Sequence, residues 1–347
     1  MAFQSTDALA LAEKLEKLVD DINSGSISLK SDDSSRLSEP ARKLSWALEA
    51  PGDTVHRVIY SPFQLPLATV GVETRIFETL SELNGTVTNA ELAKKTNIDP
   101  AMLKFLSQAG YSNDADINNC PLNLLYGKDE TFYSWLGKDL PQRERFTIWT
   151  QCFRYGLPTI FDAFDFKEEI AQGSTDSTVL FVDVAGASGH QCVALKQKYP
   201  GLSGRVIVQD RPEVIQQVKE NPLPGFDGIE AESHDLFKPQ PIKGARAYYL
   251  RAILHNWPDD KCVEILQNIK ISMTKDSKIL IDDMVLPERG AHWRATQFDF
   301  IMYSYFGAME RTYAQWEALL DKAGLKISKF VEYTKQLNES VIVAVPK

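Results

Sequence analysis

Short apolar runs alternate with helical segments in the second half of the chain, and this pattern restricts the fold more than any other feature. Four such runs lie at 179–184, 204–210, 247–252 and 278–283, and a later one lies at 340–345. Helical segments are expected between them, at 191–198 and 260–273. Strands that alternate with helices form a parallel sheet covered on both faces. The sequence therefore predicts an α/β domain, with ligands bound beyond the carboxyl ends of its strands.

The first part of the chain has a helical pattern instead. Apolar residues recur at helical spacing from Leu9 to Ile22. A polar stretch at 24–39 is rich in serine and aspartate and predicts a mobile linker. Thr88 and Glu91 then fit a capping box, and a turn near Pro100 leads into another helix. This order of elements is typical of a winged-helix-like core.

Length and charge restrict the organisation and the partners. With 347 residues and about 100–200 residues per domain, we expect two domains, a helical one at 1–165 and a sheet domain at 166–347. The net charge is −9 and no cluster of lysine and arginine is present. The winged-helix-like pattern therefore predicts packing or dimer contacts rather than nucleic-acid binding.

Other classes are disfavoured by what the sequence does not contain. No run reaches the roughly 18 apolar residues that a membrane helix needs. The amphipathic N-terminal segment does not resemble a signal peptide, so we expect a cytoplasmic protein without a membrane partner. The four cysteines are scattered, and no His/Asp/Glu cluster has ligand spacing, so we expect neither a disulfide framework nor a metal site.

Two carboxylates follow the first two predicted strands. Asp183 opens a loop of small residues that ends at His190, and a helix follows directly. Asp210 ends the second strand, where a carboxylate can hold the hydroxyls of a ribose. Either aspartate alone could equally be a cap or a strand end. Together they favour a nucleoside cofactor, and the absence of G-x-G-x-x-G disfavours NAD.

One histidine stands out from the other four by its position. His255, in Leu-His-Asn-Trp-Pro-Asp, follows a predicted strand and precedes a helix. This places it in a loop at the ligand end of the sheet, where we expect its imidazole to be exposed to substrate. With an unperturbed pKa near 6.5, a histidine can accept a proton at neutral pH.

These motifs resemble the caffeate-type, plant and fungal class of S-adenosylmethionine-dependent O-methyltransferases. The resemblance extends over nearly the whole chain and includes the segment 183–190, the His255 motif and Glu310-Arg311-Thr312. It implies a Rossmann-like class I methyltransferase domain preceded by an all-α, winged-helix-like dimerisation domain. It also implies a homodimer, S-adenosyl-L-methionine as cofactor, and a small phenol or polyketide as methyl acceptor.

The resemblance also implies a role for each matching residue. His255 would be the general base, with Asp283 and Glu310 orienting its imidazole. The residues implied in cofactor binding are Asp183, Gly186 and Gly189 of the loop, Asp210 at the ribose, Asp235 and Leu236 at the adenine, and Arg251. A carboxylate beside a catalytic histidine fixes its tautomer and stabilises the imidazolium that forms.

The chain departs from the family pattern in two places. The family loop has glycines where this chain has Ala185 and Ala187, and alanine fits there if the backbone angles are negative. The β-wing expected after Phe105 is missing, because the chain passes almost directly to Gly110. These departures leave two further hypotheses open: a methyltransferase-like pericyclase or cyclase, and a non-catalytic binding subunit.

Aromatic and sulfur-containing side chains are candidates for an acceptor pocket, although ordinary core packing is an equally good interpretation of each. These candidates are Phe132, Trp135, Trp149, Phe153, Met302, Tyr305 and Phe306.

Overall fold

The computed structural model describes residues 5–28, 31–49, 130–138, 157–288, 290–335 and 337–347, with single positions between 54 and 127. The chain divides into two compact units. One comprises Met1–Pro66 and Ile148–Gly156, and the other comprises Leu67–Thr147 and Leu157–Lys347. The predicted winged-helix-like segment and the predicted absence of a wing both fall outside the described residues.

The described part of the first unit consists of two helices, α1 (Ser5–Asn23) and α2 (Ser31–Leu48). The prediction of a linker at 24–39 is wrong for most of that stretch, since α2 begins at Ser31. Serine and aspartate are favoured at helix N-termini, so the polar composition of 31–34 suits the first turn of a helix as well as a loop. Across the described residues, no helix is both long and apolar enough to span a bilayer.

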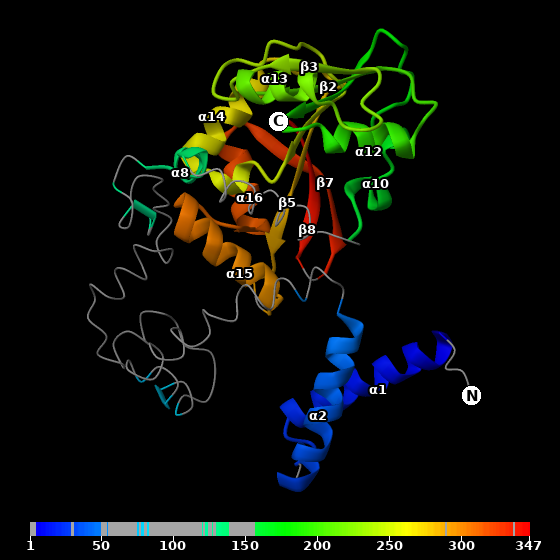
Figure 1. Ribbon diagram of the computed structural model, residues 1–347, viewed down its shortest axis with the longest axis vertical. Coiled ribbons are helices and arrows are strands. Elements are labelled where there is room, and N and C mark those ends of the chain that lie inside the picture. Colours follow the sequence, from blue (N-terminus) through cyan, green and yellow to red (C-terminus); the bar gives the residue numbers. More distant parts are fainter. Residues whose placement is uncertain are drawn as a thin grey trace. The chain divides into compact units, whose positions relative to one another are not determined.

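The second unit is built on a mixed sheet (Figure 1). Its strands are β1 (Val179–Val184), β2 (Arg205–Asp210), β3 (Ile229–Ser233), β4 (Ala247–Arg251), β5 (Lys278–Leu286), β7 (Leu325–Thr334) and β8 (Glu339–Pro346). They lie in the order β3-β2-β1-β4-β5-β8-β7, and the short β6 (Arg311–Thr312) pairs with the end of β5. The prediction of a parallel sheet is confirmed for the five strands β1 to β5. It is wrong at the other end of the sheet, where β8 pairs antiparallel with both β5 and β7.

Helices cover both faces of the sheet (Figure 1). One face packs against α10 (Ile160–Ala163), α11 (Phe166–Glu169), α12 (His190–Lys198) and α13 (Pro212–Glu220). The opposite face packs against α14 (Asp259–Lys270) and α16 (Tyr313–Lys322). Successive strand residues alternate between these layers: Tyr249 and Leu280 face the first, whereas Tyr248 and Ile281 face the second.

The core of the sheet domain extends further toward the N-terminus than the predicted boundary at residue 166. Phe161 and Phe164 are buried together with Phe166 in the layer formed by α10 to α13. Phe161 contacts Phe181 of β1 with its ring centroid 6.4 Å away. These aromatic contacts join the segment that begins at 157 to the sheet.

The parallel strands bring the cofactor-loop and histidine motifs to one edge. Because β1, β2 and β4 run in the same direction, their carboxyl ends lie side by side. The loop after β1, Asp210 of β2 and the turn after β4 all begin at this edge. Two further elements complete it: the 3-10 turn η2 (Leu254–Asn256) and a π-helical turn, η3 (Met302–Phe306), which follows α15 (Trp293–Ile301).

Candidate active site

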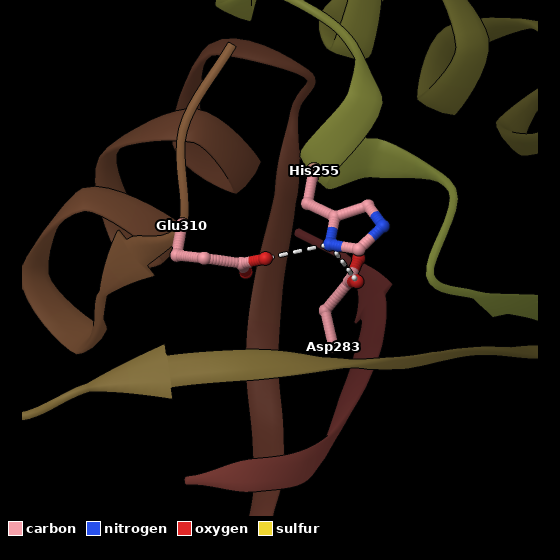
Figure 2. Close-up of side chains that lie close together, drawn as sticks. All are labelled: His255, Asp283 and Glu310. Carbon is pink, nitrogen blue, oxygen red and sulfur yellow. Dashed lines mark hydrogen bonds and ion pairs between the residues drawn. The ribbon is translucent and has the colours of Figure 1, made fainter. Parts of the chain in front are cut away.

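His255, Asp283 and Glu310 meet in space although they are far apart in sequence (Figure 2). The Nδ1 atom of His255 lies 2.7 Å from Oε1 of Glu310 and 3.6 Å from Oδ1 of Asp283. All three side chains are buried, so the expectation of an exposed imidazole is wrong. The cause is that the turn η2 is covered by the π-helical turn η3 and by the segment carrying Glu310.

The two ring nitrogens of His255 have different surroundings. Nδ1 faces both carboxylates, whereas Nε2 points away from them in Figure 2. Within the described part of the chain, Nε2 takes part in no hydrogen bond. In the neutral imidazole this arrangement favours the tautomer with its proton on Nδ1, which donates to Glu310, and leaves Nε2 as the basic nitrogen.

The electrostatics of the cluster favour a positively charged imidazole. Burial alone would lower the pKa of His255, but the negative charges of Glu310 and Asp283 raise it to about 9. Burial raises the pKa of Asp283 to about 7, although the histidine opposes this change. Both oxygens of Asp283 and Oε2 of Glu310 lack a hydrogen-bond partner among the described residues. The negative charges of the two carboxylates stabilise positive charge on the ring.

The main chain of Glu310 is held by Asp299, a residue that sequence reasoning missed. The Glu310 N–H donates to Oδ1 of Asp299 on α15 at 2.8 Å. Burial raises the pKa of Asp299 to about 6, while the hydrogen bond from Glu310 acts in the opposite direction. The spacing of these residues in the sequence does not predict the contact. The π-helical turn between α15 and the Glu310 segment determines how closely the two approach.

The loop after β1 has an unusual backbone conformation. Ala185 and Ala187 have positive φ angles of 58° and 49°, so the condition of negative angles, under which alanine would fit without strain, is not met. The Ala187 N–H donates to Oδ2 of Asp210 at 2.9 Å, and the Arg211 N–H donates to Oδ1 at 2.7 Å. Each oxygen of Asp210 keeps a lone pair that could accept a hydrogen bond from a ribose hydroxyl.

The remaining loop residues have structural reasons for their identity. Asp183 is buried beneath the loop, and a Cβ atom on Gly186 would lie 2.3 Å from Cγ of Asp183. Gly189 has φ 80° and is the N-cap of helix α12, and a Cβ atom there would lie 2.9 Å from the Phe226 ring. The structure thus explains both glycines by close packing. Their predicted role in cofactor binding stays a prediction.

Two predicted adenine contacts lie in the loop after β3. Asp235 is exposed, and its Oδ1 accepts the Phe237 N–H at 2.9 Å. Leu236 is half-buried against the layer that contains α14. This loop joins the same edge of the sheet as Asp210, because the His234 N–H donates to the Asp210 carbonyl at 2.8 Å. The placement is compatible with the predicted adenine subsite.

Arg251 belongs to a buried polar network next to the site. Its guanidinium forms an ion pair with Asp282, lies 3.2 Å from Oε1 of Glu339, and donates to the Tyr333 hydroxyl at 3.0 Å. Tyr249 also donates to Asp282, at 2.5 Å. These contacts give Arg251 a structural role between β4, β5 and β8, and its predicted contact with a cofactor stays a prediction.

Several of the predicted pocket residues form an aromatic cluster near η3. Phe132 of α8 (Phe132–Lys138) packs against Phe306 and Tyr305, with ring centroids 4.7 Å and 5.6 Å away. Trp135 lies 5.9 Å from Phe132, and Met302 is buried beside the cluster in η3. Tyr305 remains 37% exposed, so part of the cluster lies at the surface, and its predicted role in an acceptor pocket stays a prediction. The candidates Trp149 and Phe153 lie outside the described residues.

The cluster at His255 also has the composition of a metal site. One ligand atom from each of His255, Asp283 and Glu310 lies within 4.8 Å of the others. The expectation of no metal was drawn from spacing along the sequence, which cannot reveal such a group because its members come from separate elements. The short Nδ1–Oε1 distance of 2.7 Å matches a charge-assisted hydrogen bond.

Fold and site together define a class I methyltransferase-type protein with a histidine and two carboxylates at the ligand edge. Residues 166–326 match the model of the O-methyltransferase domain. The chain is 32% identical over 365 residues to the O-methyltransferase ucdC of Aspergillus ustus. The alignment covers 89% of this chain and 94% of that relative. The chain therefore belongs to the O-methyltransferase family, as the sequence motifs predict.

Solved structures agree with this assignment. The structure of LepI in complex with SAM has a TM-score of 0.65 and 28% identity, and it covers 97% of this chain and 100% of that chain. A structure described as a pericyclic reaction enzyme has a TM-score of 0.63 and 26% identity, and it covers 98% of this chain and 100% of that chain. The expectation of S-adenosylmethionine as cofactor is thereby confirmed at the level of the family.

Proposed function

We propose that this protein is an S-adenosylmethionine-dependent O-methyltransferase that methylates a hydroxyl of a small aromatic or polyketide-type metabolite. The observation that supports this proposal most is the orientation of His255. Its Nδ1 is hydrogen-bonded to Glu310, and its Nε2 is left to accept a proton. A buried base of this kind suits the deprotonation of a hydroxyl during methyl transfer.

The residues at the edge of the sheet fit the cofactor. Asp210 has carboxylate lone pairs for the ribose, and the loop at 185–189 offers backbone that a ligand can approach closely. Asp235 and Leu236 would hold the adenine. When bound, S-adenosylmethionine supplies an electrophilic methyl group on a positively charged sulfur.

The chain's own residues would then handle the proton. His255 takes the hydroxyl proton at Nε2 while Glu310 and Asp283 stabilise the resulting imidazolium. The aromatic cluster of Phe132, Tyr305 and Phe306 orients the acceptor, which must be held in line with the methyl group at near-attack distance. Burial of His255 excludes water that would compete with the acceptor.

A pericyclase or cyclase is the second candidate function. It is favoured by the similarity to the pericyclic reaction enzyme and by the alanines at positions 185 and 187. A rearrangement without methyl transfer has no evident need for a base held by two carboxylates. The geometry at His255 therefore supports methyl transfer more strongly.

Incubation with S-adenosylmethionine carrying a labelled methyl group tests the proposal. A panel of phenols and polyketide extracts should give products that carry the label, in which a methyl group replaces the hydroxyl proton. The His255→Ala variant should lose about 10²–10⁴-fold in rate while keeping its affinity for the cofactor in calorimetric titration. Products of unchanged mass would overturn methyl transfer and support the pericyclase.

The homodimer and the cytoplasmic location stay predictions. Sedimentation of the full chain at several concentrations would test the first, and localisation of a tagged protein in the source organism would test the second.

A further inference from the structure

The side chain of Arg311, which lies next to the site, is only 1% exposed. It follows Glu310 directly and begins β6, which pairs with the end of β5 just beyond Asp283. Burial would lower the pKa of Arg311, but the partners around it, Cys262 and Asp259 among them, raise it. A guanidinium kept charged at this depth must make contacts that offset its loss of hydration.

Those contacts converge on the turn that carries His255. Nη1 of Arg311 donates to the Leu254 carbonyl at 3.1 Å, and Nη2 donates to the Trp257 carbonyl at 3.0 Å. These carbonyls belong to the residue immediately before His255 and the second residue after it. The two Nη groups of one guanidinium, which form a fork of donors, therefore bind the main chain on both sides of η2.

Two neighbours hold the guanidinium itself in place. Asp259 accepts from Nε at 3.1 Å and from Nη2 at 2.9 Å, both through Oδ1. The ring of Trp316 lies beneath the guanidinium, with its centroid 5.3 Å from Cζ. A planar group with several fixed donors suits this site, whereas a lysine ammonium could not bridge both carbonyls and the carboxylate in the same geometry.

We propose that Arg311 is a positioning residue, which locks the His255 turn against the segment that carries Glu310 and so fixes the distance between imidazole and carboxylate. This inference rests on the proposed function, in which His255 is the base. Glu310 and Arg311 are consecutive residues, so one short segment supplies both the partner of the imidazole and the clamp on its backbone. The groups that face His255 are Glu310, Asp283 and Arg311.

Two substitutions separate the geometry of Arg311 from its charge. Arg311→Lys keeps the charge and loses the fork, so kcat should fall about 10²-fold because a small displacement of the base has that cost. The affinity for S-adenosylmethionine should stay unchanged, whereas the midpoint of the pH–rate profile should move to lower pH, because a looser contact with Glu310 raises the pKa of His255 less. Arg311→Met also removes a positive charge that lowers the pKa of His255, so its midpoint should lie at higher pH than that of Arg311→Lys.

A milder variant covers the case in which these proteins fold poorly. Asp259 is 34% exposed, so Asp259→Asn should fold while it loosens the hold on Arg311, with kcat about tenfold lower. Asp260→Asn is the matched control, because Asp260 is exposed, follows Asp259 in helix α14, and is not among the hydrogen-bond or ion-pair partners of Arg311 in the described residues. Its kcat should equal that of the unmodified protein.

A spectroscopic readout separates failure of this inference from failure of the proposed function. The chain has five histidines, so ¹⁵N-labelled histidine gives few signals, and the Nδ1 proton shared with Glu310 should resonate far downfield. Arg311→Lys and Asp259→Asn should broaden or shift this signal, whereas Asp260→Asn should not. An unchanged signal in Arg311→Lys would overturn the positioning role, even if the unmodified protein transfers no methyl group. Methyl transfer at the normal kcat in Arg311→Lys would overturn it as well.

Discussion

His255 and Glu310 are joined by a hydrogen bond of 2.7 Å between Nδ1 and Oε1, and 55 residues of chain separate them. Glu310→Gln replaces the carboxylate with an amide of the same shape that cannot stabilise an imidazolium. We expect methyl transfer to fall by about 10²–10⁴-fold, with little change in cofactor affinity. Single-turnover kinetics with labelled cofactor would measure the chemical step. Glu317→Gln on α16 is the control because Glu317 is exposed, and a loss of less than tenfold in Glu310→Gln would contradict the assignment.

The second carboxylate predicts the pH dependence. Only the neutral imidazole accepts a proton, and its pKa is about 9 because Glu310 and Asp283 outweigh the effect of burial. The value of kcat/KM should therefore rise about tenfold per pH unit below pH 9 and level off above it. Asp283→Asn removes one of the negative charges that raise this pKa, so the midpoint should move to lower pH. A midpoint that stays constant or rises would show that Asp283 does not act on His255.

Asp183 predicts a different pH effect, on stability. Burial raises its pKa to about 7, whereas an aspartate in the unfolded chain titrates near 3.9. The folded state thus binds the Asp183 proton more tightly than the unfolded chain does. Ionisation of Asp183 therefore destabilises the folded state, by an amount that grows as pH rises from about 4 to about 7 and is constant above pH 7. Each unit of difference in pKa between the folded and unfolded states corresponds to about 1.4 kcal/mol. Asp183→Asn should therefore raise the free energy of unfolding by a few kcal/mol at pH 8 and by less at pH 5.

Urea unfolding at the two pH values measures this difference. Asp176→Asn is the control, since Asp176 is exposed in the loop before β1 and its substitution should have little effect at either pH. An Asp183→Asn variant with the same change at pH 5 and pH 8 would show that the carboxylate is not destabilising in its ionised form.

The apolar runs of the sequence predict the central strands to within three residues. β1, β2, β4, β5 and β8 are buried along nearly their whole length, so their composition is continuous and apolar. β3 has the sequence Ile-Glu-Ala-Glu-Ser and lies at the sheet edge, where polar residues remain in contact with water. β7 forms the other edge, and its alternation from Leu325 to Ser328 is the signal that could have revealed it.

The site shows a similar division between local and long-range information. The motif around His255 and the Glu310 segment predict which residues to examine, because both are continuous in sequence. The burial of His255 and its separation from Asp283 depend on β5, η3 and β6 meeting at one point. No local pattern contains that information, and the contacts of Arg311 and Asp299 were missed for the same reason.

The conformation of the cofactor loop gives the last prediction. Ala185 and Ala187 have φ angles in the left-handed region, where alanine is about 1–2 kcal/mol less favourable than in its ordinary conformation. Glycine adopts this region without that cost but loses more conformational freedom on folding. We therefore expect Ala185→Gly and Ala187→Gly each to raise the free energy of unfolding by roughly 0.5–1 kcal/mol.

The matched control is Ala194→Gly, in the middle of helix α12, where φ is helical and glycine should destabilise by about 1 kcal/mol. The change in the free energy of unfolding, measured with urea, should have opposite signs for the loop variants and the helix variant. This result would show that the loop holds its alanines in a strained conformation. The bond from the Ala187 N–H to Asp210 maintains that conformation, so affinity for S-adenosylmethionine should be kept or increased in both loop variants. A loss of stability at position 187 equal to that at 194 would contradict the left-handed conformation of this loop.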